Sequence, residues 1–243
     1  MVNFIDRAKD IMNLVEFKDK WFATLHICVM WILTVSLSLL IIYHDPIKLV
    51  GSFIIFKIVE RLGLYVGLHM WVSHNIVNPT GLYKIAICAA MLISNIGRAS
   101  FFAKYHTIHH QYVDTIKDPH SPKFMNKWYL IFGLYPLTMY KYNQFAIPKI
   151  YGTSPMLQFI DQHYYKILSA IFGIGLWCSV QYTFYFVMIP MLLCNINNNI
   201  FFVYYLHRNG KSRNDRWINY WIPDKGGEHR THHMVGKYIE HNL

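Results

Sequence analysis

The chain has 243 residues, of which 54% are hydrophobic and only 15% are charged. Soluble globular proteins carry about 25% charged residues, so this composition argues against a soluble domain and favours a polytopic membrane protein. The formal net charge is +10. No nucleic-acid-binding motif accompanies that charge. Lys and Arg also collect beside membrane spans, so we expect a lipid bilayer, and not nucleic acid, as the partner.

Two membrane spans are expected in the first part of the chain. Residues 21–43 form an uncharged run of 23 residues, which is long enough to cross a hydrocarbon core of about 30 Å. Residues 47–68 form a second, weaker span that contains Lys57, Glu60 and Arg61. These three charges stand at helical spacing and partly neutralise one another.

Residues 69–165 are expected to form most of a cytosolic cap. They include an apolar stretch, 82–97, that has only 16 residues and is interrupted by Lys84. If this stretch crossed the membrane, His69 and His106 would lie on opposite sides of it. We therefore expect it to lie at the membrane interface or inside the cap.

Two further spans are expected at residues 166–186 and 187–206, joined by a short turn near Gln181–Thr183. Pro190 is expected to kink the last span. Residues 207–243 are polar and basic, and they would complete the cap.

The basic residues orient this topology. Two hairpins place both termini and the cap on one side of the membrane, and of the 23 Lys and Arg residues only Lys48 lies on the opposite side. Positive charge marks the cytoplasmic side. We therefore expect a multi-pass protein with cytoplasmic termini and active site. Residues 1–243 would form one all-α integral membrane domain: four transmembrane helices in two hairpins, with a cytosolic helical cap that holds a histidine-rich two-metal site.

Histidine is the compositional outlier, because eight of the 14 histidines fall into three short clusters. One cluster is HxxxxH, formed by His69 and His74, and the other two are HxxHH, beginning at His106 and His229. Residues at i, i+3 and i+4 share one face of a helix, so each HxxHH directs its imidazoles to one side. The first pair would stand about 140° apart on an ideal α-helix and would need a helix end or a distortion to meet at one metal.

Together the clusters predict a metal site more strongly than any one of them does alone. Eight imidazoles are too many for one ion, and neutral imidazoles without thiolates suit borderline metals such as iron. Two ions fit the count. A site of this kind at the mouth of a membrane domain favours O2 chemistry on a lipid tail over hydrolysis.

The three clusters resemble the histidine boxes of the membrane fatty-acyl desaturases, nearest the Δ9, stearoyl-CoA desaturase-like branch. HMWVSH is similar to the first box, HTIHHQYVDTIKDPHSP to the second with its branch-specific DTxxDPHSP continuation, and GEHRTHH to the third. FIDQHYYK, at 159–166, resembles the F-x-x-x-YYK element before that family's third span. The similarity extends from about residue 20 to residue 235.

The resemblance implies an enzyme that introduces a cis double bond into an acyl chain at a di-iron centre. O2 would be the co-substrate, and cytochrome b5 or a ferredoxin would donate the electrons. The substrate would be a fatty acyl chain carried by CoA, a lipid or a carrier protein, and it would lie in an apolar tunnel. The implied metal ligands are His69, His74, His106, His109, His110, His229, His232 and His233.

The chain departs from the family at an N-x-x-x-H element of the last span, whose His is a ninth ligand. Counting back from the third box places this element at Asn195–Asn199, so that Asn195 matches the family's Asn and Asn199 replaces the His. We therefore predict Asn199 as a ninth metal ligand. His207, two turns away, is the alternative, and a hydrogen-bonding cluster between helices is another interpretation of these asparagines.

Several residues near the boxes are predicted to support the ligands or to contact the substrate. Lys104 and Tyr105 stand where animal enzymes have a basic and acidic pair linked to CoA recognition, which leaves the carrier of the acyl chain open. Asp118 and His120 are predicted in the second shell or at the substrate mouth, the alternative for Asp118 being a turn-forming role. Glu228 is predicted to orient an imidazole, or else to be solvated.

Two rival functions remain open from the sequence. The first is a membrane di-iron hydroxylase that acts on a lipid or an alkane, because the same oxidant serves both reactions. The second is a non-catalytic, His-rich metal-binding protein such as a transporter. A transporter would place ionisable residues along its spans, whereas here the histidine clusters lie outside them, which favours an enzyme.

Overall fold

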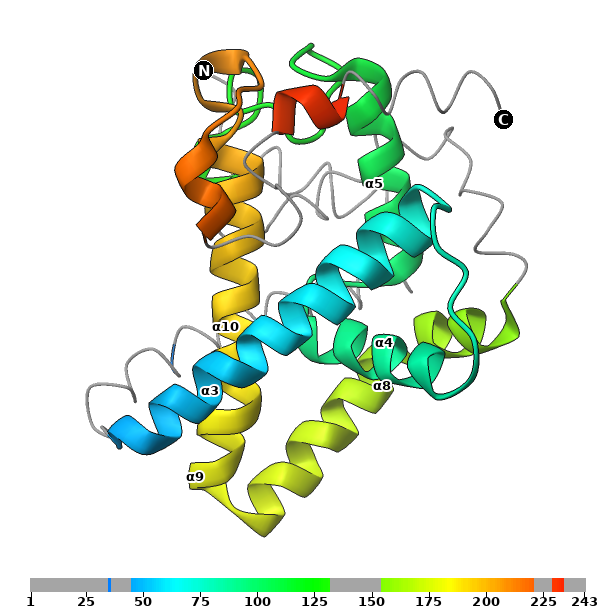
Figure 1. Ribbon diagram of the computed structural model, residues 1–243, viewed down its shortest axis with the longest axis vertical. Helices are drawn as coiled ribbons and strands as arrows, with labels where there is room; N and C mark the ends of the chain where they lie inside the picture. The colour runs from blue at the N-terminus through cyan, green and yellow to red at the C-terminus, as the bar shows by residue number, and fades with distance from the viewer. Residues whose placement is uncertain (1–34, 36–44, 132–153, 221–228, 234–243) are drawn as a thin grey trace, which may run out of the picture.

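The structure is a computed structural model that describes residues 35, 45–131, 154–220 and 229–233. These residues are helical, with no β-strand among them (Figure 1). The predicted span 21–43 lies outside the described residues except for Val35. The elements, with η marking π- or 3-10 helices, are α3 (Pro46–Val59), η1 (Glu60–Ser73), α4 (Gly81–Ser94), α5 (Ala99–Tyr112), α6 (Lys127–Ile131), α8 (Pro155–Cys178), α9 (Val180–Thr183), η3 (Phe184–Met188), α10 (Ile189–Ile196), η4 (Asn197–Tyr205), η5 (Arg208–Gly210) and η6 (Arg216–Tyr220).

Elements α3 and η1 follow each other directly, at the place where the second span was predicted. The helix begins at Pro46 because the Asp45 side chain accepts hydrogen bonds from the next backbone N–H groups. Its internal charge is partly neutralised as expected, since Lys57 lies 2.5 Å from the buried Glu60 carboxylate. Asn197 of η4 also donates to Glu60, so this polar contact joins the two long helices.

Helix α4 lies against η1, and the chain then turns sharply into α5. Helices η1 and α4 pack at very close range, which is possible because Gly63 of η1 has no Cβ. A Cβ there would stand only 2.4 Å from the Ala90 carbonyl oxygen of α4. Asn95 ends α4 in the left-handed conformation, and the axes of α4 and α5 differ by 80°. Helix α4 therefore carries the chain back toward η1 and does not separate the first two histidine clusters.

The hairpin formed by α8 and α9 differs from its predicted boundaries. Helix α8 starts at Pro155 and ends at Cys178, and the turn is at Ser179, not near Gln181–Thr183. Ser179 makes the turn because its backbone is extended and its hydroxyl accepts from Tyr182 N–H, which caps α9. From α9 the chain continues to η4 as one long helix.

Pro190 lies inside this long helix, where a kink was predicted. The backbone adopts π-helical hydrogen bonding over Phe184–Met188, just before the proline, and returns to α-helix over Ile189–Ile196. This is the kind of local adjustment that lets a long apolar helix contain a residue without an N–H donor.

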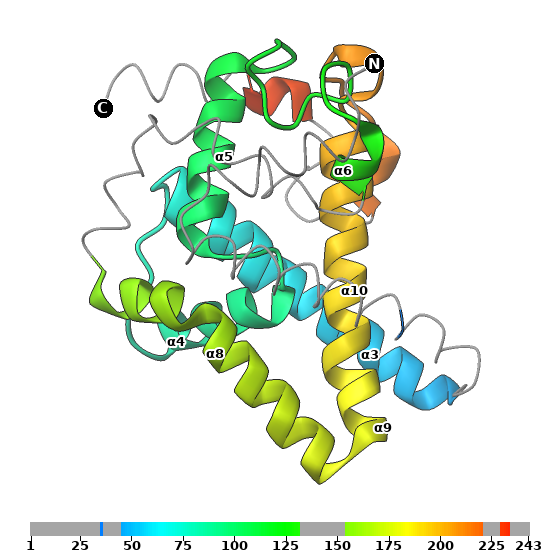
Figure 2. The ribbon, with the colours of Figure 1, turned by 180° about the vertical axis from the view of Figure 1, so that it is seen from behind.

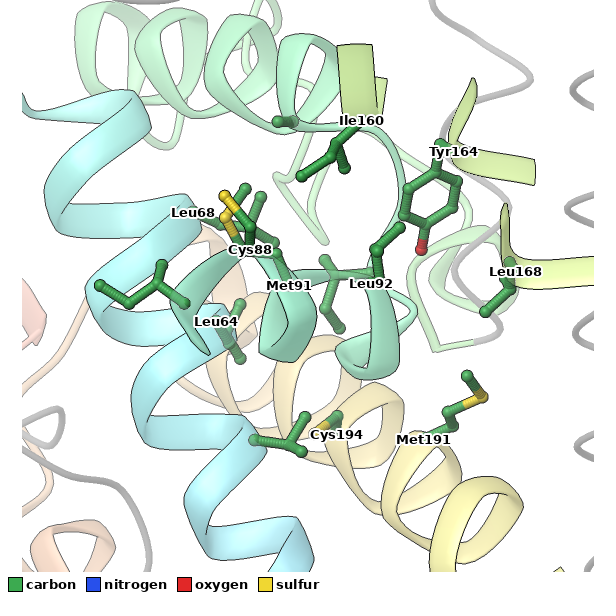
Figure 3. Close-up of a cluster of buried hydrophobic side chains, with 14 of the residues drawn as sticks. Leu64, Leu68, Cys88, Met91, Leu92, Ile160, Tyr164, Leu168, Met191 and Cys194 are labelled. Carbon is green, nitrogen blue, oxygen red and sulfur yellow. The ribbon is translucent and has the colours of Figure 1, made fainter. Parts of the chain in front are cut away.

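The hydrophobic core lies where η1, α4, α8 and α10 meet (Figure 3). Leu68 of η1, Cys88 of α4, Leu168 of α8 and Met191 of α10 are almost completely buried there. Large apolar side chains such as Ile47 and Trp177 are strongly exposed on the outer surfaces of α3 and α8.

Among the described residues, one helix, Val180–Gly210, is long and apolar enough to cross a membrane. A second is obtained if α4 and α5 are counted together as one bent span.

Candidate metal centre

Nine histidines gather beyond the core in two groups. Within each group the nearest imidazole nitrogens all lie within 4.8 Å of one another, a spacing suited to one metal ion. The first group contains His69, His74, His106, His110 and His232, and the second contains His109, His207, His229 and His233. All eight histidines predicted as ligands belong to one group or the other.

The π-helical form of η1 brings His69 and His74, which would stand about 140° apart on an ideal α-helix, toward one face. In a π-helix the backbone bond runs from residue i to residue i+5, so residues five apart come close to one face. His74 N–H donates to the His69 carbonyl at 3.0 Å, and the two rings lie 4.7 Å apart. The distortion that the spacing required is therefore present, and it brings both imidazoles to the same ion site.

Helix α5 divides its three histidines between the groups. His106 and His110, four residues apart, turn toward the first group, and their Nε2 atoms lie 2.9 Å apart. His109 turns toward the second group, with its Nε2 atom 3.2 Å from that of His233. The HxxHH of α5 is thus shared by two sites.

The short helix 229–233 is shared in the same way. His232 faces the first group, and its Nε2 atom is 3.0 Å from that of His69. His229 and His233 face the second group, with Nε2 atoms 2.9 Å apart. Figures 1 and 2 show this segment near the end of α5 that carries the histidines.

The ninth imidazole comes from His207, the alternative to Asn199. His207 lies at the end of the long helix, is 1% exposed, and places its Nε2 atom 2.7 Å from that of His229. The sequence offers a signal for it, since His207 follows a long apolar helix just as His69 does. The Asn199 side-chain oxygen accepts a hydrogen bond from Asn198, and its role as a ligand remains a prediction.

The imidazoles are held in the neutral form that binds metals. Burial lowers the pKa of His74 to about 3, and burial lowers that of His232 to about 4. Burial together with repulsion from neighbouring imidazoles lowers the pKa of His229 and His233 well below 6.5. Converging nitrogen lone pairs repel one another unless a cation lies between them, so the donor set fits two borderline divalent ions.

Two carboxylates contact imidazoles of the second group at their Nδ1 atoms. Asp118, which was predicted to support the ligands or to lie at the substrate mouth, accepts from Nδ1 of His109 through Oδ1 at 2.8 Å. Asp114 Oδ1 accepts from Nδ1 of His207 at 2.9 Å, a contact that the sequence does not predict. Burial raises the pKa of Asp118 to about 8, although backbone N–H groups of His120 and Asp114 oppose that rise.

The other predicted supporting residues have varied positions. His120 is buried, and its ring lies 5.1 Å from that of His109. Lys104 is buried on α5. Asn195 donates to the backbone carbonyls of Asn95 and Met191, which agrees with the helix-packing interpretation. Glu228 lies outside the described residues.

The chain matches no protein-family model and no curated protein. The geometry and residue types of the two histidine groups are therefore the observations that bear on function.

Proposed function

We propose that the two histidine groups bind two iron ions and that the protein is an O2-dependent fatty-acyl desaturase. The observation that carries this proposal is the gathering of nine buried or half-buried imidazoles into two adjoining groups beyond the apolar core. No thiolate belongs to either group among the described residues, and an all-imidazole donor set suits iron.

Removing two hydrogens from an unactivated acyl chain requires an oxidant that side chains do not supply, and two bound irons with O2 would supply it. In the balanced reaction, an acyl chain, O2, two electrons and two protons give an alkene and two molecules of water. The donor of the two electrons would be cytochrome b5 or a ferredoxin.

The chain's own contribution is to orient the imidazoles and to exclude water. The His109 ring is fixed by Asp118 and the His207 ring by Asp114, so that their Nε2 atoms face the second group. Burial of most of the cluster keeps bulk solvent away from a reactive centre. The proposal includes four transmembrane helices with the histidines on the cytoplasmic side.

Expression in a desaturase-deficient host, followed by fatty-acid profiling, tests the activity. We expect a new unsaturated fatty acid with the natural chain and none with His109→Ala. An alcohol product without an alkene would identify a lipid hydroxylase and overturn the desaturase proposal.

Metal analysis tests the centre separately. The purified protein should contain about two irons per chain after iron loading, one for each group. A content well below about one iron, with no gain on loading, would contradict an iron enzyme.

A further inference from the structure

A short loop after α5 contacts two imidazoles of the second histidine group, those of His109 and His207. Residues 113–121 follow α5, and both Asp114 and Asp118 lie in this loop. Asp118 Oδ1 accepts from the His109 imidazole and from His120 N–H, each at 2.8 Å. Its Oδ2 accepts from Asp114 N–H, also at 2.8 Å. The carboxylate therefore binds one ligand imidazole and shapes the loop at the same time.

Asp114 reaches across to the other long helix. Its Oδ1 accepts from Nδ1 of His207, and its Oδ2 accepts from Ser212 N–H. Asp114 has φ of +60°, in the left-handed region that non-glycine residues rarely adopt. Such a conformation is strained and persists only where the surroundings hold it in place. Here it is held by the contacts that aim the carboxylate at His207.

These two contacts fix the tautomer of both imidazoles. A carboxylate that accepts from Nδ1 keeps the proton there and leaves the Nε2 lone pair for a metal. Two carboxyl groups, those of Asp114 and Asp118, therefore hold imidazoles of the second group at their Nδ1 atoms. Nδ1 of His69 in the first group and Nδ1 of His233 in the second are both buried without a hydrogen-bond partner among the described residues. The first group differs in that His69 and His232 are partly exposed, whereas all four imidazoles of the second are buried.

We propose that the second group is the preorganised, higher-affinity site that takes up metal first, and that Asp114 and Asp118 are the positioning residues that make it so. This inference depends on the proposed function only in requiring that both groups bind a divalent metal. The carboxylates act through His207 and His109, so they are not themselves ligands.

The test is a titration of the full-length apoprotein with Co2+ in detergent, without oxygen, followed by the visible absorption of bound cobalt. We expect two binding steps of different affinity. His207→Ala should remove the tight step, and His69→Ala should remove the weak one. Equal affinities, or loss of the tight step in His69→Ala, would overturn the inference.

Variants that remove the carboxyl group then test the positioning role. Asp114→Asn and Asp118→Asn should weaken the tight step about 10- to 100-fold and leave the weak step unchanged. Asp118→Glu, which keeps a carboxyl group, should lose less affinity than Asp118→Asn. The matched control is Asp215→Asn, because Asp215 accepts from the Tyr205 hydroxyl and should leave both steps unchanged. Equal weakening of both steps, or none, would contradict the assignment.

The outcomes separate the inference from the desaturase proposal. Two unequal sites in a protein that yields no alkene would support the inference and defeat the proposed function. Two equal sites in an active desaturase would do the reverse. If a carboxylate variant does not fold, the two single-histidine variants still decide which group binds more tightly.

Discussion

Single imidazoles determine how this protein responds to acid. In the unfolded chain a histidine titrates near pH 6.5, whereas burial lowers the pKa of His74 to about 3 and that of His232 to about 4 in the folded chain. Below pH 6.5 the unfolded state therefore binds more protons than the folded state. The stabilising contribution of the neutral cluster is present above pH 6.5 and decreases as the pH falls toward 4 and 3.

We expect the melting temperature of the metal-free protein to fall steadily between pH 6.5 and pH 4. His74 alone contributes a slope of up to about 1.4 kcal/mol per pH unit. Thermal unfolding in detergent, measured at half-unit pH intervals, checks this expectation. His163→Ala, at a histidine outside both groups, should keep the same slope. A melting temperature that does not change between pH 6.5 and pH 5 would contradict it.

Two single substitutions test whether His207 or Asn199 is the ninth metal ligand. His207→Ala should reduce the metal content of the iron-loaded protein toward one ion per chain, because His207 is one of only four imidazoles in the second group. Asn199→Ala should keep two ions, since its side chain contacts Asn198. Metal analysis of both purified variants provides the comparison, and loss of an ion from Asn199→Ala alone would restore the sequence-based prediction.

At the scale of elements, the site depends on helices that approach each other unusually closely. Gly63 of η1 faces the backbone of α4, and a Cβ there would overlap the Ala90 carbonyl group. Backbone shifts less easily than the end of a side chain. Glycine at this position therefore keeps η1, with His69, in register with the chain that leads into α5.

Gly63→Ala should destabilise the protein by about 1–3 kcal/mol through overpacking. Gly173→Ala is the matched control, because a Cβ on that helical glycine would meet nothing within 4 Å. The control should be neutral or slightly stabilising, since alanine favours the helix. Chemical or thermal unfolding of the two variants measures the difference, and equal stabilities would show that the close contact relaxes freely.

Helix α5 is fixed at its start by a residue of another helix. Asp161 of α8 is buried and accepts from Arg98 and from both the backbone N–H and the hydroxyl of Ser100. This carboxylate is therefore an N-terminal cap supplied from outside α5, and it sets the position of the helix that carries three of the predicted metal ligands.

Asp161→Ala should destabilise the protein by about 3 kcal/mol, because it removes a buried ion pair together with a helix cap. Ser154→Ala removes a cap of α8 itself and should cost only about 1 kcal/mol. Unfolding of both variants in the same detergent provides the measurement. A smaller effect for Asp161→Ala than for Ser154→Ala would contradict the role of Asp161 as an anchor for α5.

For the whole molecule, the sequence predicted the helical fold from composition and i, i+3, i+4 spacing, which are local properties. It predicted the meeting of the three histidine clusters from their number and residue type, not from their spacing. It did not predict the division of His109 from His106 and His110, which depends on where helix 229–233 lies. His207 was only an alternative and Asp114 was missed, because their pairing joins positions 93 residues apart. The α8 turn was misplaced because its position depends on the Ser179 cap, whereas hydropathy continues through it.

The proposed four-span topology places Cys178 on the opposite side of the membrane from the histidines. Cys178 is exposed beside the turn after α8, whereas Cys88 and Cys194 are buried. In a variant with Cys28 replaced by Ser, a membrane-impermeant thiol reagent should label Cys178 only from the non-cytoplasmic side of sealed vesicles. Labelling from the cytoplasmic side would contradict this topology.

The position of helix 229–233 has a consequence for how the protein matures. Its three histidines complete both groups, and they are translated after every other histidine of the site. Neither group has its full set of imidazoles while the ribosome is still adding the last long helix. Under the proposed function, metal loading would therefore be a late event that follows synthesis of the last long helix. A nascent chain that stalls before residue 229 would leave two incomplete histidine groups, not one finished and one empty.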